Sequence, residues 1–538
     1  MSANITLHRA VALRKSLWKC SRQSIGISRV TRLFSGKSDD EFTSQKRLTE
    51  DTMSQSLRTM QYAVRGEVVI AADRINKELK DDPNSHPAYD HIVFTNIGNP
   101  HSVGQHSLTW PRQVLALCNL PDSVGIDHPQ APTLFPSDAI ERARKIKHGS
   151  LNDQGTGAYS HSQGVISFRE DIAKFIEDRD GGVPSNPNHI FMSNGASRAI
   201  EMILTTLLAD ETCGLMIPIP QYPIYSATIG LRGAHPVGYY LDEENAWSIN
   251  MDHLETQLAD AIAKGIKVNG FVLINPGNPT GQVLSKESVC DVVKFCAKHR
   301  LVLLSDEVYQ ENVYDENAEF YSAKRAAHDT GLLEKDAIEL VSFHSTSKGL
   351  YGECGHRGGY MEMVGMDKIV EQHIYKLASS GLCPNLDGQI MLDLMVKGPQ
   401  PGSISYESHE KEKKDIFDSL KRRAKLVTDG LDSIPGFKCT PAQGAMYCFP
   451  SIEMPEMAIQ AAEAKGTAPD TLYALSLLEE TGICVVPASG FRQKEGRYGF
   501  RTTFLPPEEE LKRCVELFKQ HHELFCEKYS DHNTASNA

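Results

Sequence analysis

The amino-acid sequence predicts an α/β protein with two domains, a large one built on a mostly parallel sheet with helices on both faces and a smaller α+β one. Two observations lead to this prediction. Between residues 190 and 345, six short apolar runs alternate with segments of helical periodicity, and polar or aromatic residues follow most of the runs. From about Ser403 onward, this alternation is replaced by one long polar helix and several short strands.

The elements of the large domain follow from hydrophobic periodicity. Residues 46–80 have helical periodicity and lead to an apolar stretch, HIVFTNIG, that predicts a strand or an extended arm. Further helices are predicted at 137–147, 167–178, 254–264 and 286–298. The predicted strands are IFMSN, CGLMIPIP, HPVGYYL, GFVLINPG, LVLLSDEVY and ELVSFHSTS, and a glycine turn and a helix follow the first of them.

The smaller domain begins with a charged helix at 408–431. It continues with the segment FKCTPAQGAMYCFP, a helix that ends near Glu480, the strand ICVVPAS, the segment YGFRTTFL and a terminal helix that begins at PPEEELKRC. The predicted division of the chain is a leader at 1–40, an N-terminal arm with part of the small domain at 41–130, the large domain at 131–400, the small domain at 401–530 and a disordered tail at 531–538.

The first 38 residues have the composition of an organelle transit peptide. They contain eight Lys or Arg and no Asp or Glu, with serines between aliphatic and aromatic residues. A solvated basic tail that binds an acidic partner is the alternative, but such tails seldom carry so many Leu, Val, Ile, Trp and Phe residues. We therefore expect import into the mitochondrial matrix and processing before about Glu41.

Bulk composition excludes two classes of partner. The net charge is −13, and subtracting the eight positive charges of the leader leaves about −21 for the rest of the chain, which disfavours binding to nucleic acid. No apolar run is long enough to span a membrane. The twelve cysteines form no C-x-x-C pair, so we expect them to be reduced and to act as small buried hydrophobic residues.

Five of the predicted strands end in chemically useful residues, namely NGAS, PQYPIY, NPGNPTG, SDEVY and STSK. An ordinary loop would explain any one of these segments. In an open parallel sheet, however, ligands bind at the carboxyl ends of the strands, so the five segments are expected to meet at one site.

Lys348 is the most informative residue of this set, because it lies among serines and glycines in SFHSTSKGLYGECGHRGGYME. A lysine in such surroundings can form a Schiff base with an aldehyde cofactor. Pyridoxal 5′-phosphate (PLP) also requires an acid for its pyridinium nitrogen, donors to its ring oxygen, an aromatic face and an anion site. Asp306 ends an apolar strand and is the candidate acid, whereas Glu307 is expected to point the other way.

The remaining requirements also have candidates. Tyr309 and Asn278 could bind the ring oxygen, and Tyr222 could stack on the ring. For the phosphate, the backbone N–H groups at the start of a helix provide an anion site, which a hydroxyl and a guanidinium would complete. The phosphate candidates are Gly195, Ala196, Ser197, Ser345 and Arg357.

The sequence resembles the fold type I, class I and II PLP-dependent aminotransferases, and within them the alanine aminotransferase branch. The segments that carry the resemblance are TNIGNPHSVGQ, GAYSHSQG, SNGAS, NPGNPTG, SDEVYQENVY, SFHSTSKGLYGECGHRGGY and YGFRTTFLPP. They cover nearly all of the chain after the leader. GECGHRGGY and FRTTFLPP are the segments typical of the alanine branch.

The resemblance implies a large PLP-binding domain with a seven-stranded, mostly parallel sheet. It implies that Lys348 is the Schiff-base lysine and catalytic base, that Asp306 pairs with the pyridinium, that Tyr222 stacks on the ring, and that Asn278 and Tyr309 bind the ring oxygen. Ser197, Ser345 and Arg357 would bind the phosphate. Arg501, assisted by Asn278 and the backbone near Gly98, would bind the substrate α-carboxylate.

The resemblance also implies a homodimer with shared active sites, because Tyr159 resembles a tyrosine that binds the phosphate in the partner subunit. The interval from Lys348 to Arg357 is one residue longer than in the aspartate branch, so Arg357 is expected to bulge back toward the phosphate. The implied activity is a ping-pong transfer of the amino group between L-alanine and 2-oxoglutarate, giving pyruvate and L-glutamate. The spacing alone does not identify the group that meets the distal carboxylate of glutamate.

Other functions could use the same scaffold. A glutamate:glyoxylate aminotransferase would share almost every cofactor contact, but the basic leader and the ending SNA, which is no peroxisomal signal, favour the mitochondrial alanine enzyme. A lyase on the same scaffold is less favoured. A non-catalytic protein that retains the fold is also less favoured, because a binding protein would not need all of Lys348, Asp306 and Arg501. His521 and His522 lie on a predicted amphipathic helix without a third ligand, so no metal site is expected.

Overall fold

The computed structural model describes residues 46–60 and 66–530. The predicted leader at 1–40 and the predicted tail at 531–538 lie outside these residues. The chain divides into two units, one up to Ser54 and one from Gln55 onward. In the described part of the first unit, Thr52 closes a turn by donating its hydroxyl to the Arg47 carbonyl at 2.7 Å.

The second unit contains a seven-stranded sheet in the order β2-β8-β7-β6-β5-β3-β4. Its strands are β2 (Ile190–Asn194), β3 (Cys213–Ile219), β4 (His235–Tyr240), β5 (Lys267–Ile274), β6 (Val302–Asp306), β7 (Leu340–Ser345) and β8 (Gly358–Val364). All adjacent pairs from β7 to β4 are parallel, and β8 is antiparallel to both of its neighbours. The mostly parallel seven-stranded sheet is therefore confirmed. Six strands were predicted from apolar runs, whereas β8 was not.

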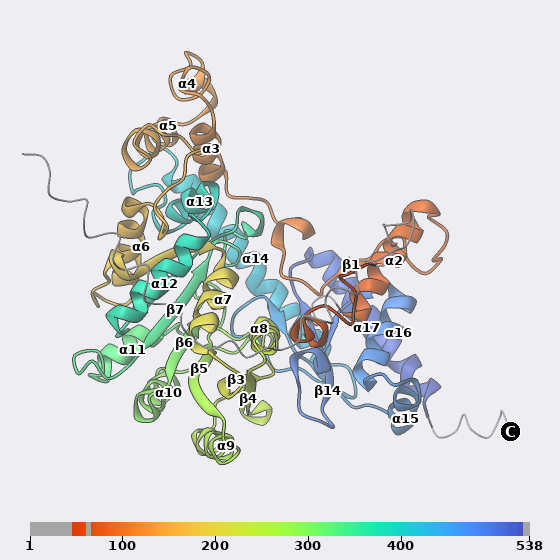
Figure 1. Ribbon diagram of the computed structural model, residues 1–538. Coiled ribbons are helices and arrows are strands. Elements are labelled where there is room, and N and C mark those ends of the chain that lie inside the picture. Colours follow the sequence, from red (N-terminus) through yellow and green to blue (C-terminus); the bar gives the residue numbers. More distant parts are fainter. Residues whose placement is uncertain (1–45, 61–65, 531–538) are drawn as a thin grey trace, which may run out of the picture. The chain divides into compact units, whose positions relative to one another are not determined.

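Helices cover both faces of this sheet because side chains alternate along each strand. Leu215 and Ile217 of β3 pack with α7 (Ala196–Leu207), α8 (Ile224–Leu231) and α12 (Lys368–Ser380) on one face. Met216 packs on the other face with α9 (Met251–Ala263), α10 (Lys286–His299) and α11 (Ala323–Asp329). Figure 1 shows strands β3 to β7 between helices α7 and α8 and the row formed by α9, α10 and α11.

A third apolar cluster lies beside β2 and β8. It combines Trp110, Phe168, Ile190, Tyr360 and Ile390. The helices around it are α3 (Thr109–Asn119), α5 (Ser137–Arg144), which continues as a π-helical turn at Lys145–Ser150, α6 (Ile166–Arg179) and α13 (Leu386–Val396), with the short α4 (Ala131–Leu134) nearby. Helix α3 lies N-terminal to the boundary predicted at 131 and packs in the same cluster as the elements that follow it, and the boundary stays a prediction.

The remaining elements share another core. Val68, Leu420, Leu477, Phe500 and Phe518 are among its buried residues. Its helices are α2 (Glu67–Asp81), α14 (Tyr406–Asp432), α15 (Glu456–Lys465), α16 (Pro469–Thr481) and α17 (Glu508–Lys528), and a short α1 (Gln55–Thr59) precedes them. Its strands are β9 (Phe437–Lys438), β10 (Tyr447–Cys448), β11 (Ser451–Ile452) and β14 (Tyr498–Thr503), and β13 (Val486–Pro487) pairs with β14.

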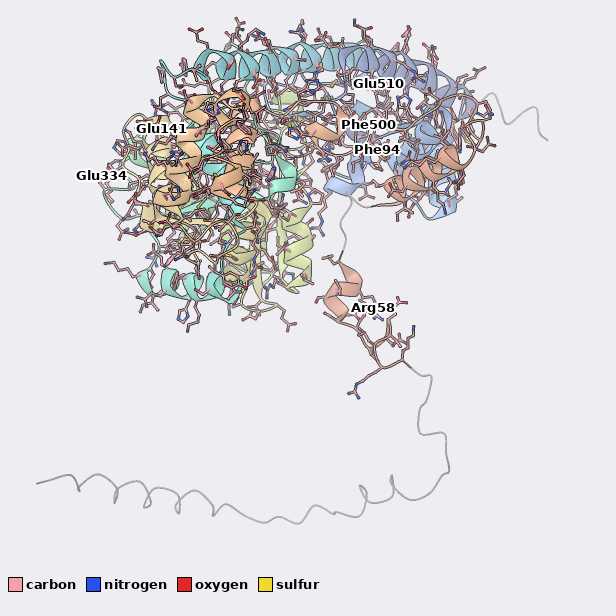
Figure 2. All side chains as sticks on the ribbon, turned by 90° about the horizontal axis from the view of Figure 1, so that it is seen from above. Arg58, Phe94, Glu141, Glu334, Phe500 and Glu510 are labelled. Carbon is pink, nitrogen blue, oxygen red and sulfur yellow. The ribbon has the colours of Figure 1, made fainter. Side chains whose placement is uncertain are left out.

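One strand pair connects distant parts of the sequence in this core. Strand β1 (Val93–Phe94) pairs in parallel with β12 (Ile483–Cys484). The amide of Thr503 also donates to the Thr95 carbonyl at 3.0 Å, and Figure 2 shows Phe94 and Phe500 within the same group of elements. These contacts hold the end of β1 in place, and Gly98 follows four residues after Phe94.

Two smaller predictions can be compared with the described residues. No helix in 46–60 and 66–530 has the length and apolar character of a membrane span. Eleven cysteines lie in the described part of the chain, all of them free thiols, and eight of these are buried. His521 and His522 are also buried, and His521 stacks edge-on against Tyr473 at a ring-centroid distance of 4.8 Å.

Candidate active site

A cavity of about 340 Å³ lies at the carboxyl ends of β5, β6 and β7. The predicted site residues that line it are Gly98, Ala196, Ser197, Tyr222, Asn278, Asp306, Tyr309, Ser345, Lys348, Arg357 and Arg501. They come from at least six separate segments of the chain. The strand ends therefore meet at one cavity, as predicted.

The Lys348 side chain is half-buried and lies just after the end of β7. Its Nζ donates a hydrogen bond of 2.6 Å to the Gly98 carbonyl. This places a primary amine in the cavity and attaches it to the segment that follows β1. A carbonyl acceptor fixes the position of the amine without neutralising it by a carboxylate.

Asp306 is the last residue of β6 and is only 5% exposed. Burial raises the pKa of its carboxyl group to about 6, although the Tyr225 hydroxyl, the Val308 amide and the charge of Lys348 oppose this effect. Oδ2 accepts a hydrogen bond of 3.0 Å from Tyr225. Oδ1 is buried and has no hydrogen-bond partner among the described residues.

Glu307 points to the other side of the strand, as predicted. Its Oε2 lies 3.2 Å from Arg179 Nη1, and its Oε1 accepts hydrogen bonds from the Ser305 hydroxyl at 2.9 Å and the Ala323 amide at 3.1 Å. Only Asp306 of this acidic pair therefore lines the cavity.

The hydroxyls of Tyr309 and Tyr447 and the side-chain amide of Asn278 also line the cavity. The Tyr309 hydroxyl donates to that of Tyr447 at 3.5 Å. Burial raises the pKa of Tyr309 well above its usual value, so it stays protonated as a donor. Burial also acts on Tyr447, but the positive charges of Lys348 and Arg501 and the Tyr309 hydroxyl outweigh it and lower the pKa of Tyr447.

An anion site forms where β2 turns into α7. Gly195 adopts φ +80°, and a Cβ there would stand 2.1 Å from Arg357 Nη2, so only glycine allows the guanidinium this close to the backbone. Arg357 donates to the Ser197 hydroxyl at 3.2 Å and to the Ser347 hydroxyl at 3.3 Å. The first N–H groups of α7 lack intrahelical acceptors, and they supply the remaining donors.

Arg357 itself adopts φ +55°, in the left-handed region. The backward bulge of Arg357 toward a phosphate, expected from the longer interval after Lys348, stays a prediction. Ser345 lies beside this site, where its hydroxyl accepts a hydrogen bond of 3.3 Å from the Ser347 amide.

Arg501 is on β14 and only 1% exposed. Its Nη1 donates to Asn278 Oδ1 at 3.1 Å and its Nη2 to the Asn96 carbonyl. The guanidinium carbon stands 4.2 Å from the Tyr447 ring centroid. Among the described residues its charge thus meets neutral groups, and its buried Nε has no partner, so an anion that enters the cavity can pair with it.

Tyr159 is not brought into this cavity. Its side chain is 74% exposed and lines a separate hollow with Gln154 and His161. The role expected for it in a partner subunit stays a prediction.

Several residues that line or support the cavity were not predicted, among them Tyr225, Ser347, Cys354 and Tyr447. Ser347 and Cys354 lie within the segment around Lys348 that had been singled out, so their neighbourhood was a usable signal. Tyr225 lies three residues after Tyr222 but contacts a strand 81 positions away. No pattern in the neighbouring sequence identifies Tyr225 or Tyr447 as a site residue.

These residues fit PLP by their own chemistry. The unpartnered Oδ1 of Asp306 matches a protonated ring nitrogen, because a buried carboxylate oxygen needs a cation or donor. The anion site around Arg357 matches a phosphate, and the Lys348 amine matches an aldehyde.

Comparisons with known proteins agree with this geometry. The family model for aminotransferase class I and II matches residues 129–518. The chain belongs to this family. It is 49% identical over 484 residues to alanine aminotransferase 1, mitochondrial, from Arabidopsis thaliana, a match that covers 90% of this chain and 88% of the relative. It is 45% identical to glutamate–glyoxylate aminotransferase 2 of the same plant, over 91% of this chain and 98% of the relative.

Solved structures share the fold of this class I and II family member. An alanine aminotransferase from Pyrococcus furiosus superimposes with a TM-score of 0.67 at 25% identity, and the match covers 88% of this chain and 100% of that one. An aspartate aminotransferase from Rhizobium meliloti gives a TM-score of 0.65 at 19% identity, with 88% and 98% coverage, and supports the fold alone. The fold class predicted from the sequence is confirmed.

Proposed function

We propose that this chain is a PLP-dependent transaminase that moves the amino group between L-alanine and 2-oxoglutarate, giving pyruvate and L-glutamate. The observation that carries this proposal is the single cavity that contains the Lys348 amine, the unpartnered Oδ1 of Asp306 and the Arg501 guanidinium. An amine, a buried acid and a buried cation in one cavity match an amino-acid substrate bound beside PLP.

Different residues would bind different parts of the cofactor. Asp306 would bind the ring nitrogen, Tyr309 and Asn278 the ring oxygen, and Tyr222 the ring face. Gly195, Ala196, Ser197, Ser345 and Arg357 would bind the phosphate. When bound, PLP supplies an aldehyde carbon and an electron-accepting ring.

The substrate is oriented by Arg501. A bidentate pair between its guanidinium and the α-carboxylate fixes the amino acid, and Asn278 and the backbone at Gly98 support this position. Lys348 Nζ then accepts the Cα proton of the substrate and later returns a proton on the reverse half-reaction. Because the keto acid leaves before the second one binds, the kinetics are expected to be ping-pong.

The alternative acceptor is glyoxylate, since glutamate–glyoxylate aminotransferases are among the relatives at 45% identity. The deciding assay uses purified protein with L-alanine and 2-oxoglutarate, and then with glyoxylate as the competing acceptor. Formation of glutamate as the main product supports the proposal. Glycine as the main product under equal concentrations supports glyoxylate as the preferred acceptor, and no transfer from alanine to either acceptor contradicts the proposal.

We propose that the protein acts in the mitochondrial matrix as a homodimer. Relatives named mitochondrial alanine aminotransferases from Arabidopsis thaliana and Dictyostelium discoideum support the location. In an import assay with isolated mitochondria, the precursor should become protected from protease and lose a segment that ends before about Glu41. Protein left accessible and unprocessed would contradict the location.

The exposed Tyr159 supports the shared site, and a mixing experiment tests it. Lys348→Ala and Tyr159→Ala variants, each inactive or weak, should regain activity when subunits are exchanged. In a mixed dimer one site has both native residues. If activity stays at the level of the weaker parent after exchange, Tyr159 does not serve a partner's site.

A further inference from the structure

The loop from Gly349 to His356 connects Lys348 with Arg357 and contains the segment GECGH, to which the proposed chemistry assigns no role. It delivers Arg357 to the anion site with a left-handed backbone, φ +55°. A residue other than glycine rarely adopts this conformation unless surrounding contacts enforce it. One residue with a buried carboxylate lies in the middle of this loop and contacts the elements on either side of it.

That carboxylate belongs to Glu353, whose side chain is 3% exposed. Its Oε1 accepts a hydrogen bond of 2.7 Å from Arg112 Nε, and its Oε2 accepts one of 2.7 Å from Arg112 Nη2. Two parallel charge-assisted hydrogen bonds fix both distance and direction, so this pair is a geometric clamp rather than a loose surface ion pair.

The clamp is anchored on a rigid element. Arg112 lies on α3, whose Trp110, Val114 and Leu117 are buried in the cluster beside β2 and β8. The guanidinium therefore projects from a helix that packing holds in place. Loss of the pair would leave the buried carboxylate without its counter-charge, which is costly enough to move the loop.

Glu353 is connected to both ends of the loop. Its amide donates to the Thr346 carbonyl at 2.8 Å, and the next residue, Cys354, donates its thiol to the Ser347 carbonyl at 3.0 Å. The Cys354 carbonyl in turn accepts a hydrogen bond of 3.1 Å from Arg357 Nη1. Cys354 is thus the single residue that connects Glu353 with the Arg357 guanidinium, so a shift of Glu353 would shift that guanidinium.

Two imidazoles also face this carboxylate. His101 Nδ1 stands 3.9 Å and His356 Nε2 3.7 Å from Glu353 Oε2. Both separations exceed a hydrogen bond, so these rings make weaker contacts than Arg112 does. Arg112 is the partner that sets the geometry.

We propose that Glu353, bound by Arg112, is a positioning residue that holds Arg357 in place for the phosphate of the cofactor. This inference rests on the proposed function, because it assigns the phosphate of PLP to the anion site. It explains how a loop one residue longer than in the aspartate branch still presents an arginine beside Ser197.

The test compares a phosphorylated ligand with its unphosphorylated counterpart. Dissociation constants of PLP and of pyridoxal are measured for the cofactor-free protein, the Glu353→Gln variant and the Arg112→Gln variant. Both variants should weaken PLP binding by about tenfold or more, equivalent to about 1.4 kcal/mol, while pyridoxal binding changes by less than about threefold.

Two controls separate positioning from general damage. Arg144→Gln removes an arginine that is about as exposed as Arg112 and pairs with Asp127 at 2.7 Å on the surface, and it should leave both constants unchanged. Melting temperatures of the cofactor-free variants show whether they fold. The Arg112 side chain is 43% exposed, so Arg112→Gln should disturb folding less than Glu353→Gln does. The test can therefore be made on Arg112→Gln if Glu353→Gln does not fold.

The outcomes are distinct. A loss confined to PLP supports the inference. Equal losses for PLP and pyridoxal, or no loss in a folded variant, overturn it while the proposed function stands. A wild-type protein that does not bind PLP overturns the proposed function itself.

Discussion

The Tyr225 hydroxyl donates a 3.0 Å hydrogen bond to Oδ2 of Asp306, whereas Oδ1 of the same carboxylate has no partner in the described part of the chain. One oxygen is thus occupied by the protein and the other is left for a ligand. The helix that carries Tyr225 packs on the face of the sheet, so this relationship fixes the carboxylate plane before any ligand binds.

Replacing Asp306 tests the proposed acid directly. Asp306→Asn keeps the shape of the side chain and its contact with Tyr225, but it removes the negative charge that would pair with a pyridinium. We expect kcat to fall by at least a factor of about 10² to 10³, typical for loss of one preorganised electrostatic contact. Steady-state assays with alanine and 2-oxoglutarate check this, and a near-normal rate would place the acid elsewhere.

Although Asp306→Asn should lower kcat, it should raise the stability of the cofactor-free protein above about pH 6. In the cofactor-free protein the pKa of Asp306 is raised to about 6 from an ordinary value of 3.8, chiefly by burial. A raised carboxyl pKa favours the folded state while the group is protonated, and this advantage is lost as the pH rises through about 4 to 6. The difference corresponds to about 3 kcal/mol.

The cofactor-free Asp306→Asn variant should therefore unfold at the same denaturant concentration as wild type below about pH 4 and should be the more stable of the two above about pH 6. Denaturant titrations at several pH values measure this. Tyr225→Phe, which removes a hydrogen bond that lowers the pKa of Asp306, should shift the transition to higher pH. A pH-independent difference would show that Asp306 does not titrate in this range.

Arg501 can be tested separately from the cofactor. Arg501→Lys keeps a positive charge but cannot form a bidentate pair with a carboxylate. We expect kcat/KM for alanine to fall by about 100-fold, in line with truncating one partner of a buried charge pair, while PLP binding is unchanged. Arg497→Lys, at an exposed position, is the control and should behave as wild type. Loss of PLP binding in Arg501→Lys would argue against a substrate role.

Gly98 should tolerate no side chain. A Cβ at this position would stand 2.1 Å from Tyr447 Oη and 2.8 Å from Lys348 Nζ. Gly98→Ala must therefore displace one of these groups, and we expect activity to fall while the protein stays folded. Gly149→Ala, whose Cβ would meet nothing within 4 Å, is the matched control. Wild-type kinetics in Gly98→Ala would show that neither group needs its position.

The sequence predicted the strand ends well because each of them carries its signal locally. Asp306 follows LVLLS, and Lys348 follows a serine-rich turn, so the apolar run and the neighbouring residues identify both. Strand β8 escaped prediction because the glycines of GGYMEMV weaken the strand signal, although Gly359 has to be small where its Cβ would stand 2.6 Å from the Gly195 backbone.

The supporting contacts could not be predicted for a different reason. Tyr225 with Asp306 and Arg112 with Glu353 join positions 81 and 241 residues apart, respectively. Periodicity and spacing describe neighbours along the chain, whereas these pairs depend on how helices pack on a sheet. The residues with local chemical signals were therefore found, and those that orient them were not.

The pairing of β1 with β12 bears on how the protein is made. Residues 93–98 leave the ribosome early, but their strand partner Ile483–Cys484 and the guanidinium of Arg501 emerge almost last. A chain cut short before these residues would lack Arg501 and with it one wall of the cavity. The pocket therefore forms only once both distant parts of the chain are present and folded together, so a truncated chain has no complete site.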